Sequence, residues 1–184
     1  MKNLMFLFIL STGLLLSSCG SEPPAEEELS QDRLSELIQG LQSALEEQKD
    51  QPRVDSATVR TLVDRVEEYA RRFPQDTLTP KFLFRTAAAS RGIGDFEKAV
   101  ELWGRITVSY ENYKRAPEAL FLQGLTLDEN LADTDRARQQ YEAFLERYPK
   151  HPLANDARLL LEAARSGKSG NDLVKEFKQK QEEE

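Results

Sequence analysis

Apolar residues recur at three- and four-residue steps through most of the chain, which is the spacing of one face of an α-helix. In residues 31–53 this pattern predicts an amphipathic N-terminal helix that ends ahead of Pro52, because the residue before a proline disfavours helical backbone. A second helix is expected in residues 56–72. The two stripes consist of Leu34, Leu37, Ile38, Leu41 and Leu45, and of Leu62, Val66, Tyr69 and Phe73.

Three stretches within residues 54–166 resemble one another at a nearly constant interval. Phe73, Tyr110 and Tyr148 succeed one another at 37 and 38 residues, and Pro80 and Pro117 are also 37 residues apart. A fixed period of this size indicates stacked supersecondary units, each of which packs against the next.

Each unit is expected to contain two helices. Pro80 and Pro117 suit the first turn of the first helix, where a missing N–H costs nothing, and Thr79 stands where it can cap the helix ahead of Pro80. The glycines in residues 92–94 break the chain, and Asp95 starts the second helix. Its apolar stripe, which we expect to be core, consists of Phe96, Ala99, Val100, Trp103 and Ile106.

Residues 94–100 (GDFEKAV) resemble the turn and the start of the second helix of the tetratricopeptide repeat. In the next unit Ala137, Tyr141 and Pro149 match the small, aromatic and proline positions of that repeat, and Gly124 matches the glycine of its first helix. The resemblance implies an all-α fold, a right-handed solenoid of antiparallel helix pairs.

The sequence also departs from the standard repeat. Its period is 37–38 residues, against about 34 in the family. Leu83 and Leu120 stand at the usual Trp position, and Glu111 stands where Pro is expected.

Residues 1–18 have the plan of a secretory signal: one Lys, a broken apolar run and small residues. The run is too short for a membrane-spanning helix of about 20 apolar residues. It ends in the segment 16–19 (LSSC), which resembles a bacterial lipobox and implies that Cys19 becomes the lipidated first residue of the mature protein. The alternatives are a plain signal peptide and an N-terminal anchor, each with an incidental Cys.

The two ends of the mature chain are expected to differ in character. Residues 19–30 predict an acidic tether, since residues 20–28 hold four glutamates and two prolines and lack a large apolar residue; a sorting signal is the alternative. Residues 167–184 predict a short capping helix, followed by a tail that frays. The apolar residues of that capping helix are Leu173, Val174 and Phe177.

Composition excludes several classes of function. The net charge of -7, from 25 basic and 32 acidic residues, argues against a generic nucleic-acid binder, which needs a basic face. The single Cys excludes an internal disulfide, and the single His, His151, argues against a His-based zinc site or catalytic triad. We therefore expect a protein that is not an enzyme, with no metal, no cofactor and no small-molecule substrate.

The resemblance implies that the first helices of successive pairs line an inner groove. By register, one unit contributes Lys81, Phe84 and Arg91 to this groove, and the next contributes Glu118, Phe121 and Asp128. Phe84 and Phe121 are then candidate apolar anchors for an extended or helical peptide. The alternative is that both rings pack against neighbouring helices.

Residues 147–154 (RYPKHPLA) and 115–121 (RAPEALF) resemble sequence segments of tetratricopeptide lipoproteins from Gram-negative envelopes. These include the lipoprotein subunit of the outer-membrane β-barrel assembly machinery and the Tol–Pal-associated division coordinator. The resemblance implies a scaffold anchored in the outer membrane through Cys19, with its body in the periplasm, that binds envelope proteins or peptides. A self-associating structural lipoprotein and an accessory subunit of an envelope enzyme are the alternatives.

Overall fold

The computed structural model describes residues 29–48 and 55–167, together with residues 172, 175, 178, 179 and 181. The expected signal sequence, Cys19 and most of the expected tether lie outside these residues. So do residues 49–54 and the apolar residues of the expected capping helix.

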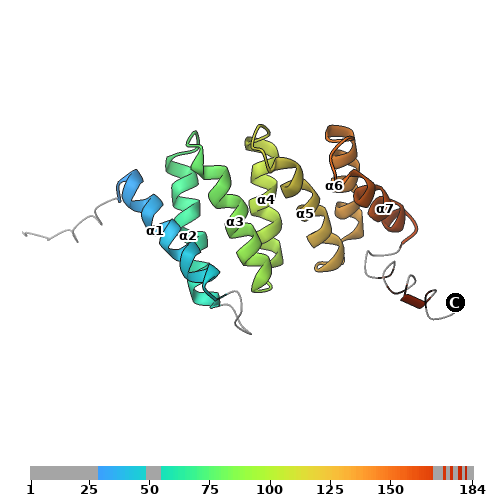
Figure 1. The fold of residues 1–184 in the computed structure, drawn as a ribbon, viewed down its shortest axis with the longest axis horizontal. Helices are drawn as coiled ribbons and strands as arrows, with labels where there is room; N and C mark the ends of the chain where they lie inside the picture. Colours follow the sequence, from blue (N-terminus) through green and yellow to red (C-terminus); the bar gives the residue numbers. More distant parts are fainter. Residues whose placement is uncertain are drawn as a thin grey trace, which may run out of the picture.

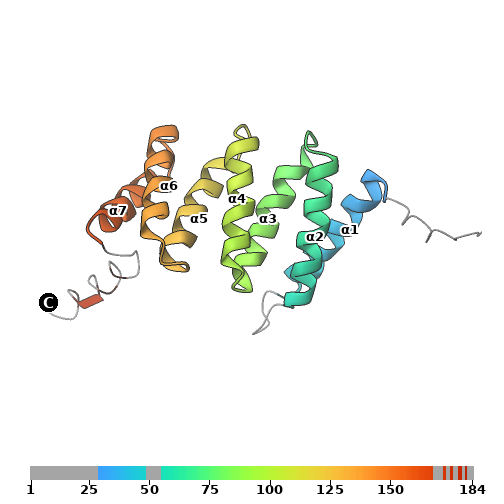
Figure 2. The same ribbon diagram turned by 180° about the vertical axis from the view of Figure 1, so that it is seen from behind.

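The described part of the chain contains seven α-helices in succession, without strands. Each helix packs chiefly against its neighbours in sequence, which produces two layers. Figure 1 shows the layer of α1, α3, α5 and α7 in front. Figure 2, the view from the opposite side, shows the layer of α2, α4 and α6 in front. The expected all-α array of stacked helix pairs is confirmed. The helices are α1 (Gln31–Glu46), α2 (Ser56–Arg72), α3 (Leu78–Gly92), α4 (Phe96–Ser109), α5 (Ala116–Glu129), α6 (Thr134–Arg147) and α7 (Ala154–Arg165).

The N-terminal helix is shorter than the sequence pattern predicts. α1 ends at Glu46, and residues 47 and 48 form a turn. The side chain of Gln48 accepts a hydrogen bond of 3.0 Å from the backbone N–H of Asp55, the residue that caps α2. The turn is thereby tied to the start of the next helix.

Arg72 fastens the beginning of α1 to α2. Its Nη2 donates to the backbone oxygen of Leu29 at 2.7 Å, and its Nη1 pairs with Glu68 at 2.8 Å. Arg65 pairs with the same carboxylate at 3.1 Å. Burial by itself raises the pKa of Glu68, but the hydrogen bonds from Arg72 and Arg65 lower it overall. The apolar side chains of Leu34 and Ile38 complete this contact and are fully buried.

The three connections from the second helix of one pair to the first helix of the next share one set of backbone hydrogen bonds. In each, an aromatic residue ends the helix and its N–H bonds back four residues. Two further bonds, each spanning three residues, then lead into the next helix. After Phe73 the two later donors are the N–H groups of Asp76 and Thr79; after Tyr110 they are those of Tyr113 and Ala116; after Tyr148 they are those of His151 and Ala154. The repeat deduced from the sequence is therefore also a repeat of backbone structure.

The expected role of Thr79 as a helix cap is wrong. α3 begins at Leu78, so Thr79 and Pro80 both lie inside its first turn. The hydroxyl of Thr79 is buried and donates to the backbone oxygen of Phe73 at 2.7 Å. Thr79 thus joins α3 to the end of α2 instead of satisfying its own helix terminus.

Aspartates cap the second helix of each pair. Asp55, Asp95 and Asp133 each accept a hydrogen bond from a backbone N–H in the first turn of α2, α4 and α6. Ahead of Asp95, Gly94 has a φ of 84°, a left-handed conformation that glycine adopts without a steric penalty. The expected break before Asp95 is confirmed.

Small residues let the two helices of a pair approach closely. A Cβ atom placed on Gly124 of α5 would lie 2.9 Å from Cε1 of Tyr141 and 3.2 Å from Cβ of Gln140, both in α6. Ala99 and Ala137, at equivalent positions of α4 and α6, are fully buried. In the described residues, no helix is both long enough and apolar enough to cross a membrane.

We predict that Gly124→Ala destabilises the fold. An alanine inside a helix normally stabilises it by up to about 1 kcal/mol relative to glycine. Here the added methyl group forces the α5–α6 contact apart, at a cost of about 1–3 kcal/mol. Urea unfolding of residues 20–184, monitored by circular dichroism, measures the difference. Gly40→Ala in α1 is the control, since its Cβ would meet nothing within 4 Å. An equal gain in stability from both substitutions would contradict the close approach.

Candidate binding site between α1 and α3

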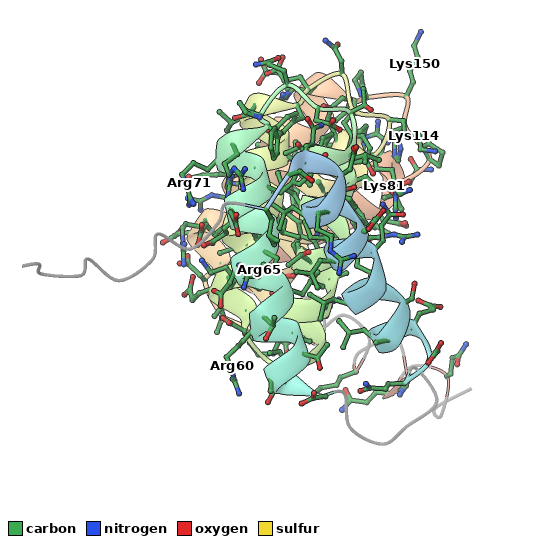
Figure 3. The ribbon with its side chains drawn as sticks, turned by 90° about the vertical axis from the view of Figure 1, so that its left-hand side faces the viewer. Arg60, Arg65, Arg71, Lys81, Lys114 and Lys150 are labelled. Carbon is green, nitrogen blue, oxygen red and sulfur yellow. The ribbon has the colours of Figure 1, made fainter. Side chains whose placement is uncertain are left out.

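The structure does not bring the six groove residues expected from the sequence together on one open surface. Phe84, Phe121 and Asp128 are buried, with 4%, 8% and 2% of their surfaces exposed. Lys81 is exposed near the connecting loops, on the side of Lys114 and Lys150 in Figure 3.

The remaining two groove residues are already engaged with neighbours. Arg91 is half-buried, and its Nε donates to Oδ1 of Asn130 at 3.1 Å. Glu118 pairs with Nε of Arg115.

The expectation that Phe84 and Phe121 are exposed anchors is therefore wrong, and the packing alternative holds. Phe121 lies between two rings of α6, with centroid distances of 6.3 Å to Tyr141 and 5.8 Å to Phe144. Phe84 faces Trp103 of α4 at 6.5 Å, which makes Trp103 a core residue, as predicted. In both helix pairs, α3–α4 and α5–α6, the phenylalanine ring of the first helix packs against an aromatic residue of the second.

Asp128 belongs to the same interior. Burial, followed by the nearby charge of Asp128, raises the pKa of the Tyr141 hydroxyl above its ordinary value. A carboxylate in this position lies within the α5–α6 pair and is not available to a partner.

A pocket of about 630 Å³ opens where α1 and α3 lie next to each other. Its size falls in the range typical of ligand sites. Leu62 from α2 and Phe84 contribute to its apolar lining, together with Leu45, Ala88 and Ala89. Its polar lining comprises Gln42, Ser43, Glu46, Arg85 and Arg115. Of the six expected groove residues, Phe84 alone borders this pocket.

The two arginines of the pocket are held in different ways. The guanidinium of Arg115 lies over the ring of Phe84, 3.7 Å from its centroid, and its Nε pairs with Glu118. Such a stacked cation is attracted by the negative face of the ring. Arg85 is exposed, and its Nη1 makes a long hydrogen bond of 3.4 Å to Oε1 of Gln42. Gln42 itself is 8% exposed.

The sequence pattern did not predict Gln42, Arg85 and Arg115 as site residues. One signal was present: Leu34, Ile38 and Gln42 succeed one another at four-residue steps and are the buried positions of α1. A glutamine on an apolar face marks a polar group that needs a partner. Nothing in the repeat pattern singles out Arg85 or Arg115, because their role depends on the position of α1.

Metal-ligating side chains do not gather at this pocket in the described part of the chain. Among the described residues, no three His, Cys, Asp or Glu side chains are placed to hold a metal ion. His151 lies in the α6–α7 loop, where its Nδ1 accepts from the N–H of Leu153 at 3.2 Å and its ring meets Phe144 edge-on at 5.6 Å.

Comparison with known proteins identifies a tetratricopeptide repeat in residues 118–151. These residues span most of α5, all of α6 and the start of the following loop. The comparison with curated proteins found no match. Tetratricopeptide arrays present extended binding surfaces, so the repeat implies a scaffold for protein–protein interaction.

We predict that Phe121→Ala destabilises the protein by about 3–5 kcal/mol, the usual cost of removing a buried phenyl ring. Urea unfolding of residues 20–184 measures this loss. Val108→Ala is the control, because Val108 is 78% exposed and should change stability little. An unchanged midpoint for the Phe121 variant would make the ring a surface anchor after all.

Proposed function

We propose that this protein is a lipid-anchored interaction scaffold of a bacterial envelope. It binds protein or peptide partners in the pocket between α1 and α3 and performs no chemistry itself. The observation that carries this proposal is the open pocket on the layer of first helices, within an array that contains a tetratricopeptide repeat. Outer-membrane assembly and coordination of envelope division are the processes that its sequence resemblances favour, with the body in the periplasm.

The proposed anchor is Cys19, at the end of the apolar run of residues 4–16. Where the described chain begins, Arg72 holds the carbonyl of Leu29 against α2. The ten residue-to-residue steps from Cys19 to Leu29 span at most about 35 Å when fully extended. The array would therefore stay within roughly one domain diameter of the membrane surface.

A second candidate function is self-association, and one observation favours it. Leu159 of α7 is at the repeat position of Phe84 and Phe121, yet it is 61% exposed. No second helix within the described residues covers it. An uncovered apolar side chain at the end of a stack is a place where a further unit can add.

We predict that Cys19→Ala prevents lipid attachment. Since one residue carries the proposed modification, the variant should remain an uncleaved precursor or release its body from the membrane fraction. Metabolic labelling with a fatty acid, combined with membrane fractionation, measures both effects. Ser18→Ala, which keeps the cysteine, serves as the control. If the Cys19 variant labels and fractionates like the natural chain, the anchor is elsewhere.

We predict that Ala88→Trp abolishes partner capture. The indole would fill the pocket beside Phe84, and capture of envelope proteins by immobilised residues 20–184 should fall at least tenfold, a loss of about 1.4 kcal/mol. Val108→Trp adds the same ring at an exposed site of α4 and should leave capture intact. Equal capture by both variants would move the binding surface elsewhere.

Light scattering of the same preparations tests the second candidate function, self-association. Self-association requires that the measured molar mass rises with protein concentration and that Leu159→Ser lowers it.

A further inference from the structure

The pocket between α1 and α3 has more hydrogen-bond donors than acceptors. Of its charged lining residues, Arg85 and Arg115 are basic and Glu46 is acidic. Arg115 pairs with Glu118 through its Nε. Its two Nη groups have no hydrogen-bond partner within the described residues. To the residues that the structure describes, Arg85 makes one hydrogen bond, the long one to Gln42. A ligand that fits these donors must accept hydrogen bonds, and a carboxylate is an acceptor that guanidinium groups bind strongly.

Gln42 provides a second and independent indication. More than nine-tenths of this residue is buried, and its Oε1 receives the bond from Arg85. Its amide nitrogen is buried and has no partner within the described part of the chain. Buried amide donors are almost always paired in folded proteins. Because Gln42 lines the pocket, a rotation of its amide group would present this donor to a molecule that enters.

The floor of the pocket sets a further condition on the ligand. Leu45, Ala88 and Ala89 offer its accessible apolar surface, and the buried side chains of Leu62 and Phe84 lie beneath them. The guanidinium of Arg115 lies over the Phe84 ring, so that its two Nη groups border this apolar lining. Apolar surface and cationic donors thus meet within one cavity.

From this arrangement we infer that the pocket recognises an acidic peptide, whose large apolar side chain occupies the floor while an adjacent carboxylate binds Arg85 and Arg115. The inference rests on the proposed function and specifies the chemistry of its partner. Charge-assisted bonds from guanidinium to carboxylate are strong and directional. Complementary charge would select the partner and orient it. The carboxylate belongs either to an Asp or Glu side chain or to the end of a chain.

Three small probes separate these requirements. N-acetyl-phenylalanine carries a ring and a terminal carboxylate, and its amide carries the ring alone. The amidated dipeptide N-acetyl-Phe-Asp carries the ring and a side-chain carboxylate. Titration into ¹⁵N-labelled residues 20–184, monitored by NMR, should shift the side-chain amide of Gln42 and the Nε–H groups of Arg85 and Arg115. At least one acidic probe should bind about tenfold more tightly than the neutral amide, and the stronger acid identifies the source of the carboxylate.

Variants test whether the named arginines are responsible. Arg85→Gln and Arg115→Gln should each remove most of the preference for the acidic probes. Lys81→Gln is the control and should preserve this preference, because Lys81 is an exposed residue of α3 that lies outside the pocket. Equal binding of acidic and neutral probes, or shifts away from Gln42, would overturn the inference. Binding of decanoate without binding of the phenylalanine probes would also overturn it and assign the pocket to a free amphiphile.

The outcome is distinguishable from failure of the proposed function itself. If Arg85→Glu leaves the capture of envelope proteins unchanged while Ala88→Trp abolishes it, the scaffold function stands and the acidic partner does not. If the acidic probes bind at Gln42 but the natural chain captures no envelope protein, the recognition chemistry stands and the scaffold function fails.

Discussion

Packing between sequence neighbours is the constraint on which this structure depends. Each helix contacts chiefly the helix before it and the helix after it, so apolar surface is covered only where the next helix supplies side chains. Arrays of this kind derive their stability from nearest-neighbour interfaces and not from one central core. Their ends, and any boundary with small side chains, consequently remain open. The pocket between α1 and α3 and the exposed Leu159 lie at such places.

Three equivalent residues illustrate the constraint. Phe84, Phe121 and Leu159 occupy the same repeat position in α3, α5 and α7. Trp103 of α4 packs against the first ring, and Tyr141 of α6 packs against the second. Leu159 remains 61% exposed, since no described helix packs beyond α7 in the stack. The same register position is therefore core or surface according to whether the next helix of the array covers it.

The pocket arises from a difference in side-chain size between two repeats. Ala88, Ala89 and Gly92 of α3 border it, whereas the equivalent positions of α5 hold the larger Leu125, Thr126 and Glu129. Arg85 likewise corresponds to Leu122, so a cation stands at the pocket where the next repeat has an apolar residue. Space and positive charge coincide at one boundary between units, and this coincidence is the reason why the proposed binding site is placed at the α1–α3 boundary.

The sequence by itself determined the helices, their repeat and their class, because periodic apolar positions, Asp95, Gly94 and the recurring aromatic residues act over a few neighbouring residues. It also identified the small residues that let paired helices meet, such as Gly124. The tertiary structure decided which periodic residues are exposed. Register alone assigned Phe84 and Phe121 to an open groove, but Trp103 and Tyr141 bury them. Gln42 and Arg85 lie 43 residues apart, and they meet only because α1 packs into the same layer as α3.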